Sequence, residues 1–257
     1  MARSHIKSKL LKSALLLRDD SISPCMPETR GLTQENLNLM LQSYGMVYVK
    51  PDRGRYGRGV MRIDLLTEAG PHFQLRCGRR SRVYTSWASL AKGMRSMQVG
   101  RNYLVQQGIH ALQHEGRPFD IRVMVQRSPS RQWKTTGYIA RVAAPRSIVT
   151  NFHSGGTPAT LEPVLAHHVA GDQVSGLISR LCLLGETVAA RLHASFPGLT
   201  AVGLDIALDQ DLNPWILEVN TRPLADLFAR LKDKTMFRRM CRYAKAVGDL
   251  RPKRRKR

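Results

Sequence analysis

Three oxygen-bearing side chains near the carboxyl end of the sequence have the types and spacing of a divalent-cation site. Asp205 lies in one short apolar run, and Glu218 and Asn220 lie in a second run beyond a turn rich in Asp, Asn and Pro at residues 209–214. Alternating apolar runs around such a turn predict a β-hairpin. If the chain reverses at residues 211–212, Asp205 lies opposite Glu218, and strand alternation places Asn220 on the same face.

Two opposed carboxylates would have Cβ atoms only about 4.5 to 5.5 Å apart and would repel each other unless a positive charge lay between them. A divalent cation is the simplest such charge. Asp, Glu and Asn oxygens suit Mg²⁺, which uses one or two protein carboxylates and takes its other ligands from water and phosphate. Mn²⁺ is the alternative ion. A solvated acidic hairpin without metal also fits these residues, because the register is only inferred.

A glycine-rich loop between two predicted strands, 46–50 and 60–63, has the composition of a phosphate-binding loop. Its spacing differs from the Rossmann and Walker A motifs, and protein kinases place their lysine after the loop rather than before it. Glycines allow backbone N–H groups to approach phosphate oxygens, and cations add positive potential. A plain hairpin with flexible glycines is the competing interpretation. The residues concerned are Lys50, Arg53, Gly54, Arg55, Gly57, Arg58 and Gly59.

A second predicted hairpin, with strands 120–126 and 133–142, carries charged residues on one face. Asp120 and Arg122 share a strand face, and Arg141 lies on the return strand. Arginines in this arrangement could neutralise a phosphoryl group during its transfer. A cross-strand salt bridge between Asp and Arg is the structural alternative.

Length and composition describe a globular protein with an excess of positive charge. The chain has 257 residues, 42% of them hydrophobic, and 41 Lys and Arg against 19 Asp and Glu, which gives a formal charge of +22. This charge attracts nucleotides, acidic polymers and nucleic acids alike, so nucleic-acid binding stays an alternative function. The four cysteines lack paired spacing and are typical of reduced thiols in a cytoplasmic protein. No apolar run is long enough for a membrane span.

Further elements must position these residues. The apolar pattern predicts a helix that begins after Thr33 and ends at Gly45, because Thr is a favoured N-cap and Gly a favoured helix stop. The other expected elements are strands 73–77 and 103–107, helices 87–97 and 172–194, and a basic helical region 224–247 with Leu227, Phe228, Leu231 and Met240 facing inward.

Taken together, the sequence resembles the YheC/YheD family of endospore coat-associated proteins within the ATP-grasp superfamily. The resemblance covers residues 6–247, and it is the succession of motifs that makes it specific. The matching segments are residues 26–29, 48–51 with the glycine loop, 105–109, 119–122, 133–141, 150–156, 203–205 and 217–223.

This resemblance implies an α+β ATP-grasp fold, in which two lobes with antiparallel sheets clamp ATP. The expected organisation is an N-terminal helical segment (1–24), a small lobe with the glycine loop and hinge (25–108), a large lobe with the metal site (109–248) and a basic disordered tail (249–257). Because the chain begins where the central lobe is expected, most of the N-terminal domain that precedes it in many relatives is expected to be absent.

The resemblance also implies a role for each candidate residue. Asp205, Glu218 and Asn220 would coordinate Mg²⁺, and Lys50 would bind phosphate under the loop formed by Gly54, Gly57 and Gly59. The hinge at Gln106, Gln107, Gly108 and Ile109 would meet adenine through backbone groups. Arg122 and Arg141, together with Lys50, would act in catalysis at the γ-phosphate or an acyl phosphate, and Asn151 and Arg222 would contact the substrate.

Three features depart from the family pattern. Many ATP-grasp ligases have an arginine two residues before the metal Asp, whereas this chain has Gly203, so Arg141 is expected to supply that charge. The hinge has glutamines where an acidic residue is common, which leaves the ribose partner unassigned. An earlier lysine is usual in the fold, and Lys9 and Lys12 both compete for its role.

The resulting hypothesis is an ATP-dependent carboxylate–amine ligase that acts through an acyl phosphate on a carboxylate-bearing, acidic substrate. The alternative is a nucleotide-binding protein without turnover that associates with spore-coat proteins. The expected location is the cytoplasm, with the spore surface as the site of association.

Overall fold

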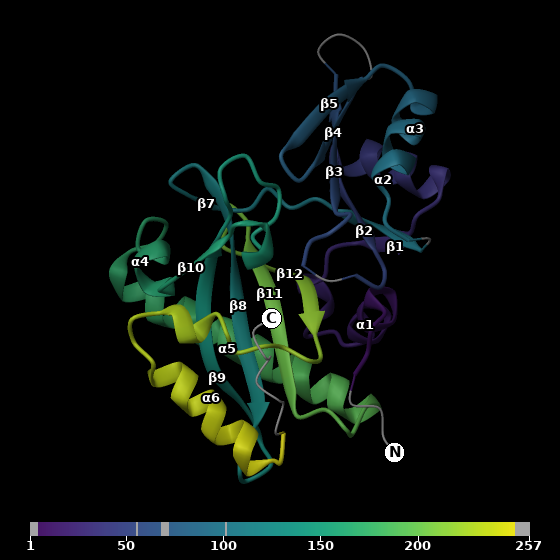
Figure 1. The fold of residues 1–257 in the computed structure, drawn as a ribbon. Helices are drawn as coiled ribbons and strands as arrows, with labels where there is room; N and C mark the ends of the chain where they lie inside the picture. Colours follow the sequence, from purple (N-terminus) through teal and green to yellow (C-terminus); the bar gives the residue numbers. More distant parts are fainter. Residues whose placement is uncertain (1–4, 55, 68–71, 101, 250–257) are drawn as a thin grey trace, which may run out of the picture.

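The computed structural model describes residues 5–54, 56–67, 72–100 and 102–249, which form two antiparallel sheets with helices between and around them (Figure 1). The first sheet has the strand order β1-β6-β2-β3-β4-β5 and the second β10-β9-β8-β11-β12, with the short β7 paired to β8. Arg55 of the glycine loop and residues 250–257 of the expected basic tail lie outside the described residues.

The small-lobe sheet is covered on one face by two helices, α2 (Gln34–Tyr44) and α3 (Trp87–Met97). The side-chain oxygen of Thr33 accepts a hydrogen bond from the Asn36 N–H and Gly45 ends α2 in the left-handed conformation, so both predicted caps are confirmed. The strands are β1 (Thr29–Gly31), β2 (Met46–Pro51), β3 (Met61–Leu66), β4 (His72–Cys77), β5 (Arg80–Tyr84) and β6 (Tyr103–Gln107).

The large-lobe sheet lies on the longest helix, α5 (Gly171–Ser195). Strand alternation directs Ile121, Val123 and Val125 toward this helix and leaves Asp120 and Arg122 on the opposite face. The strands are β7 (Gln113–His114), β8 (Arg117–Arg127), β9 (Trp133–Val142), β10 (Thr157–Ala159), β11 (Ala201–Leu208) and β12 (Pro214–Asn220), and the remaining short helices are η1 (Ser23–Cys25), η2 (Phe152–Ser154) and α4 (Leu161–Leu165).

The region after Pro223 is only partly helical, so the expected helical region 224–247 is wrong in its extent. A single 3-10 turn, η3 (Phe228–Arg230), is followed by irregular backbone and then by α6 (Thr235–Ala246). The Asp233 carboxylate accepts a hydrogen bond from the Thr235 N–H at 2.8 Å, at the point where α6 begins after its N-cap residue Lys234.

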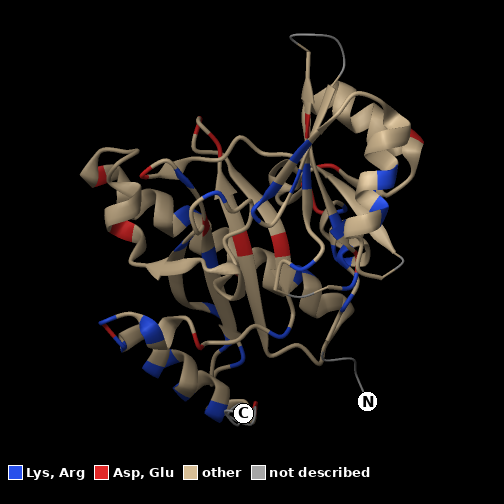
Figure 2. Ribbon diagram, turned by 45° about the horizontal axis from the view of Figure 1, so that its top comes forward, with Lys and Arg blue, Asp and Glu red and all other residues tan. Residues whose placement is uncertain are grey.

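The inward-facing residues of this region were identified correctly. Phe228 and Met240 are buried, and Leu227 and Leu231 pack against the same cluster, on the half of the sheet that Met124 and Ile139 occupy. Several positions of α6 are Lys or Arg and are coloured blue on its ribbon (Figure 2). The other half of this face of the large-lobe sheet carries the charged residues Asp120, Arg122, Arg141 and Asp205.

The N-terminal helix α1 (Lys9–Leu16) connects the two sheets. One Asp52 carboxylate oxygen accepts hydrogen bonds from the N–H groups of Lys9 and Leu10, at 2.8 and 3.0 Å, which ties the start of α1 to the small lobe. The Ile6 N–H donates to Thr221 Oγ1 at 2.9 Å and ties the preceding residues to the large lobe. The segment therefore lines one side of the space between the lobes.

Among the described residues, no helix combines the length and the apolar character needed to cross a bilayer. All four cysteines are free thiols.

Candidate functional site

The hairpin of β11 and β12 has the register expected at its charged end. Asp205 lies opposite Glu218, and Gly203 lies opposite Asn220. The turn is one residue tighter than expected, since Leu208 pairs with Pro214, and the register shifts after Asp205 so that Leu217 is the extra residue. A bulge of this kind re-aims the side chains beyond it. The predicted opposition of the two carboxylates is confirmed, although the turn centre is displaced.

The turn itself is held by Asp209. Its carboxylate accepts hydrogen bonds from the N–H groups of Asp211 and Asn213, at 3.0 and 2.8 Å, and from the Trp215 indole N–H at 2.9 Å. A short carboxylate that bonds its own following backbone is typical of a turn.

The Asp205 carboxylate is in contact with two guanidinium groups. Arg122 Nε donates to Asp205 Oδ1 at 2.5 Å, and Arg141 Nη2 lies 2.9 Å from Asp205 Oδ2. Burial alone would raise the pKa of Asp205, but the two guanidinium groups outweigh that effect and hold the pKa below its ordinary value. The carboxylate is therefore ionised at neutral pH.

Arg141 is held on its other side by Asp120, directly opposite it in the sheet. Arg141 Nε and Nη2 donate to the two Asp120 oxygens at 2.7 and 2.5 Å, and Thr150 Oγ1 donates to Asp120 at 2.6 Å. The cross-strand salt bridge that was the structural alternative is thus present. Burial would lower the pKa of Arg141, but Asp120 and Asp205 raise it, so the guanidinium stays charged.

The oxygen donors expected at the metal site are of the chemical type that magnesium prefers. Glu218 Oε1 lies 3.6 Å from the Lys9 ammonium, so a protein cation occupies the neighbourhood of this carboxylate. In the part of the chain that the structure describes, no three His, Cys, Asp or Glu side chains form a metal cluster. Mg²⁺ commonly uses only one or two protein carboxylates with phosphate and water, so Asp205, Glu218 and Asn220 are a suitable set for it.

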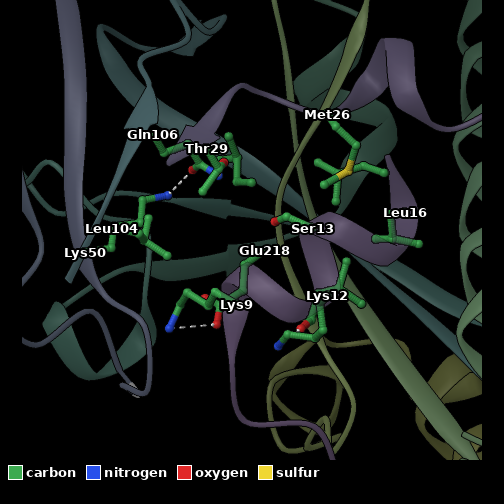
Figure 3. Close-up of a pocket in the computed structure, with 13 residues that line it drawn as sticks. Lys9, Lys12, Ser13, Leu16, Met26, Thr29, Lys50, Leu104, Gln106 and Glu218 are labelled. Carbon is green, nitrogen blue, oxygen red and sulfur yellow. Dashed lines mark hydrogen bonds and ion pairs between the residues drawn. The ribbon is translucent and has the colours of Figure 1, made fainter. Parts of the chain in front are cut away.

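A pocket between the lobes lies next to this face and is lined by three lysines (Figure 3). Lys9 and Lys12 enter it from α1, and Lys50 enters it from β2. Its other wall comes from β12 and includes Glu218. The remaining lining residues are Ser13, Leu16, Met26, Thr29, Leu104, Gln106, Ile216, Leu217 and Val219.

Two of these ammonium groups have neutral oxygens as hydrogen-bond partners. Lys50 Nζ donates to Gln106 Oε1 at 2.5 Å, and Lys12 Nζ donates to the Val219 carbonyl. Burial lowers the pKa of each lysine from 10.5 to about 8. The lining has three lysines against one carboxylate, that of Glu218, so this pocket favours an anionic ligand.

Two backbone N–H groups of the hinge at Gln106 to Ile109 already have hydrogen-bond partners within the protein. The Gln107 N–H donates to Glu28 O and the Gly108 N–H donates to Met46 O, both at 2.9 Å. A Cβ on Gly108 would lie 2.7 Å from that Met46 carbonyl, so glycine is required by close packing. A purine at this hinge would have to use backbone groups other than these two N–H groups.

The glycine loop lies against the segment that follows β9. Gly57 has a φ of +69°, and a Cβ there would lie 3.1 Å from Asn151 Oδ1. The Tyr56 and His153 rings are 4.1 Å apart in an edge-to-face arrangement, and Tyr56 itself has a φ of 65°. The structure therefore brings the expected phosphate loop and Asn151 together.

The segment after β12 packs over Gly203 in β11, the position at which the family resemblance led us to expect an arginine. A Cβ on Gly203 would lie only 2.8 Å from the Pro223 Cβ, so a larger residue would displace the segment that carries Arg222. Arg222 itself is exposed. The expectation that Arg141 supplies the missing charge agrees with its 2.9 Å distance from Asp205.

Two supporting residues were missed by sequence reasoning. Asp52 orders the start of α1, and Thr150 orders Asp120. Both lie within segments matched to the family, the glycine loop and residues 150–156 respectively, and that position was the available signal.

The lowered pKa of Lys50 and Lys12 predicts that anion binding weakens in alkaline solution. Above about pH 8 the free protein loses these protons, whereas a bound polyphosphate would retain them. ATP affinity is therefore expected to fall by up to about tenfold per pH unit for each lysine as the pH rises above that value. Titration calorimetry at such a pH, in two buffers of different ionisation enthalpy, should show proton uptake on binding.

The stability of the nucleotide-free protein should rise with pH in the range where ATP affinity falls. The folded-state pKa of about 8 lies below the ordinary value of 10.5, so the unfolded chain binds more protons between these values. The contribution of these lysines to the free energy of unfolding therefore rises with pH in this window. ATP affinity that stays constant across the window would contradict the placement of Lys50 and Lys12 at the anion site.

Comparison with known proteins gives one family for nearly the whole chain. A family model described as YheC/D like ATP-grasp matches residues 3–247. The endospore coat-associated protein YheD of Bacillus subtilis (strain 168) is 26% identical over 246 residues, which cover 91% of this chain and 53% of YheD. YheC of the same organism is 24% identical over 204 residues, which cover 79% of this chain and 56% of YheC. The chain therefore spans about half the length of these relatives.

Solved structures show the same fold at low sequence identity. D-cycloserine synthetase DcsG matches with a TM-score of 0.55 and 13% identity, over 95% of this chain and 69% of that chain. The C-terminal domain of K. lactis Pby1, an ATP-grasp enzyme, matches with a TM-score of 0.53 and 15% identity, over 96% of this chain and 73% of that chain. At these identities the likeness concerns the fold alone.

Proposed function

Because the chain belongs to the YheC/D-like ATP-grasp family, we propose that it binds ATP with Mg²⁺ between its lobes and uses ATP to join a carboxylate to an amine. One observation carries this proposal. Three lysines and a carboxylate of the opposed Asp205–Glu218 pair line a single pocket, so that groups suited to phosphate and to a hard metal ion lie side by side.

The lysines and the glycine loop would bind the triphosphate. Lys50 and Lys12 supply buried positive charge, and Lys9 lies beside Glu218. The loop at Gly57 already contacts the Asn151 segment, so it can cover the phosphates and exclude water. Water exclusion matters because an acyl phosphate hydrolyses readily.

The charged sheet face would support phosphoryl transfer. When bound to Asp205, Glu218 and Asn220, Mg²⁺ would neutralise phosphate charge. A substrate carboxylate oxygen would attack the γ-phosphorus and ADP would leave, giving an acyl phosphate. An amine nitrogen would then attack the acyl carbon, and phosphate would leave as the nitrogen loses a proton. Asp120 and Asp205 hold the Arg141 guanidinium at this face to stabilise the developing charge.

ADP release measured with a panel of carboxylates and amines tests this reaction. We expect ADP to form only when a correct pair is present together with Mg²⁺, and the amide to form in equal amount. ATP binding without ADP release for any pair in a broad metabolite panel would contradict turnover.

A second candidate function is nucleotide binding without turnover. Both curated relatives are named endospore coat-associated, and that name carries this candidate. It predicts association with spore-coat proteins that depends on bound ATP and leaves the nucleotide intact.

A further inference from the structure

An exposed arginine is stacked on an exposed aromatic ring beside the charged sheet face. The Arg230 guanidinium carbon lies 4.2 Å from the centroid of the Phe152 ring, and Phe152 is 36% exposed. Arg230 is also exposed, and within the described ranges it forms no ion pair with a carboxylate. The pair joins η3 to the segment that carries Asn151.

Stacking leaves the edge of the guanidinium available for a ligand. The ring contact restricts the position of the guanidinium group, and because Arg230 is exposed, N–H donors in the guanidinium plane remain accessible. This planar fork matches the two oxygens of a carboxylate or phosphate. A stacked arginine loses less freedom on binding an anion than an unsupported surface arginine does.

The stacked pair lies close to the groups that would hold the reacting carboxylate. Phe152 follows Thr150 by two residues, so their Cα atoms are at most about 7.6 Å apart. Thr150 donates to Asp120, and Asp120 holds Arg141. The segment 150–152 therefore links the Asp120–Arg141 pair at one end to the Phe152–Arg230 pair at the other.

Other exposed arginines lie on the segments that carry the stacked pair or pack against it. Within residues 222–230 the exposed charged side chains are Arg222, Asp226 and Arg230, so cations outnumber anions there. Arg58 is exposed in the glycine loop, whose Gly57 packs against the segment after β9. A ligand with a single negative charge would use only the groups at the reacting end and would leave these cations without a partner.

We infer that Arg230, oriented by Phe152, binds a second anionic group of the substrate. The substrate class is therefore a molecule with at least two anionic groups, such as a short acidic peptide, rather than a simple monocarboxylate. This inference rests on the proposed function, because that function places the first carboxylate at Arg141. Arg230 determines specificity here, and Phe152 is a positioning residue.

Calorimetric titration with three short peptides tests the inference in the presence of Mg²⁺ and ADP. The probes are tetraglutamate, a tetrapeptide with phosphoserine side chains and a tetraserine control. Arg230→Gln should weaken binding of the better anionic peptide by about tenfold, because a charge-assisted hydrogen-bonded pair is lost. Arg230→Lys should give a smaller loss, since it keeps the charge but not the fork. The anionic peptide that binds more tightly identifies the group as carboxylate or phosphate.

The matched control is Arg242→Gln, which removes an equal charge from an exposed position on α6. It should weaken anionic peptide binding less than about twofold, as screening limits distant surface charges. Equal losses in the two Gln variants would overturn the inference, as would the absence of measurable binding of either anionic peptide to the unchanged protein. Thermal unfolding of Arg230→Gln checks that the fold is intact.

Failure of the proposed function is measured separately. A fluorescent ATP analogue should bind to Arg230→Gln within about twofold of its affinity for the unchanged protein, because Arg230 lies outside the lysine-lined pocket. If the unchanged protein does not bind the analogue, the proposed function fails whatever the peptides show. If it binds the analogue but Arg230→Gln leaves peptide affinity unchanged, only the second anion site is wrong.

Discussion

Asp205→Asn is expected to lower Mg²⁺-dependent ADP release by about three orders of magnitude, because the site loses the charge that supports a metal ion at the triphosphate. The buried carboxylate also balances Arg122 and Arg141, at 2.5 and 2.9 Å. Removing it leaves two buried guanidinium groups with less compensation, which is expected to cost about 3 kcal/mol of unfolding free energy. Turnover at a series of Mg²⁺ concentrations measures the first effect, and urea unfolding measures the second.

Glu218→Gln separates the two effects. Glu218 is half-buried, and its ion pair with Lys9 is long at 3.6 Å, so its loss should change stability by less than about 1 kcal/mol. Mg²⁺ dependence should nevertheless be lost. Asp211→Asn is the matched control, because Asp211 is exposed in the turn of the same hairpin. If Asp205→Asn and Glu218→Gln both retain Mg²⁺-dependent ATP binding, the metal site is wrongly assigned.

Lys50→Met is expected to weaken ATP binding by about a hundredfold without destabilising the nucleotide-free protein. Loss of a buried charge partner typically costs a few kcal/mol of binding free energy. In the free protein, however, this ammonium has the neutral Gln106 oxygen as its partner, and burial lowers its pKa to about 8. That shift corresponds to about 3 kcal/mol against the charged form at neutral pH. The two measurements are titration with a fluorescent ATP analogue and urea unfolding.

A loss of ATP affinity without a loss of stability distinguishes a binding role of Lys50 from a structural one. Lys92→Met provides a control, since Lys92 is exposed on α3, and it should change neither quantity appreciably. An affinity for ATP that survives in Lys50→Met would exclude Lys50 from the phosphate site. A large loss of stability with unchanged affinity would instead assign Lys50 a structural role.

Local patterns in the sequence were sufficient for much of the fold. The helix between Thr33 and Gly45 was predictable because its caps are local hydrogen bonds and a local φ angle. The opposition of Asp205 and Glu218 was predictable because strand alternation and a short turn leave few registers. The helical region after Pro223 was not, because the interruption before Thr235 depends on how this segment lies over Met124 and Ile139.

The sequence by itself determined which chemical groups the site contains, since the metal-type oxygens, the glycine loop and the paired arginines all occur in recognisable local patterns. Only the tertiary structure decided which cations accompany which carboxylates. Arg122 and Asp205 are 83 residues apart, and Lys12 reaches the Val219 carbonyl from 207 residues away. Side-chain partners at such separations depend on how sheets and helices pack, and a one-dimensional pattern carries no information about distances across that packing.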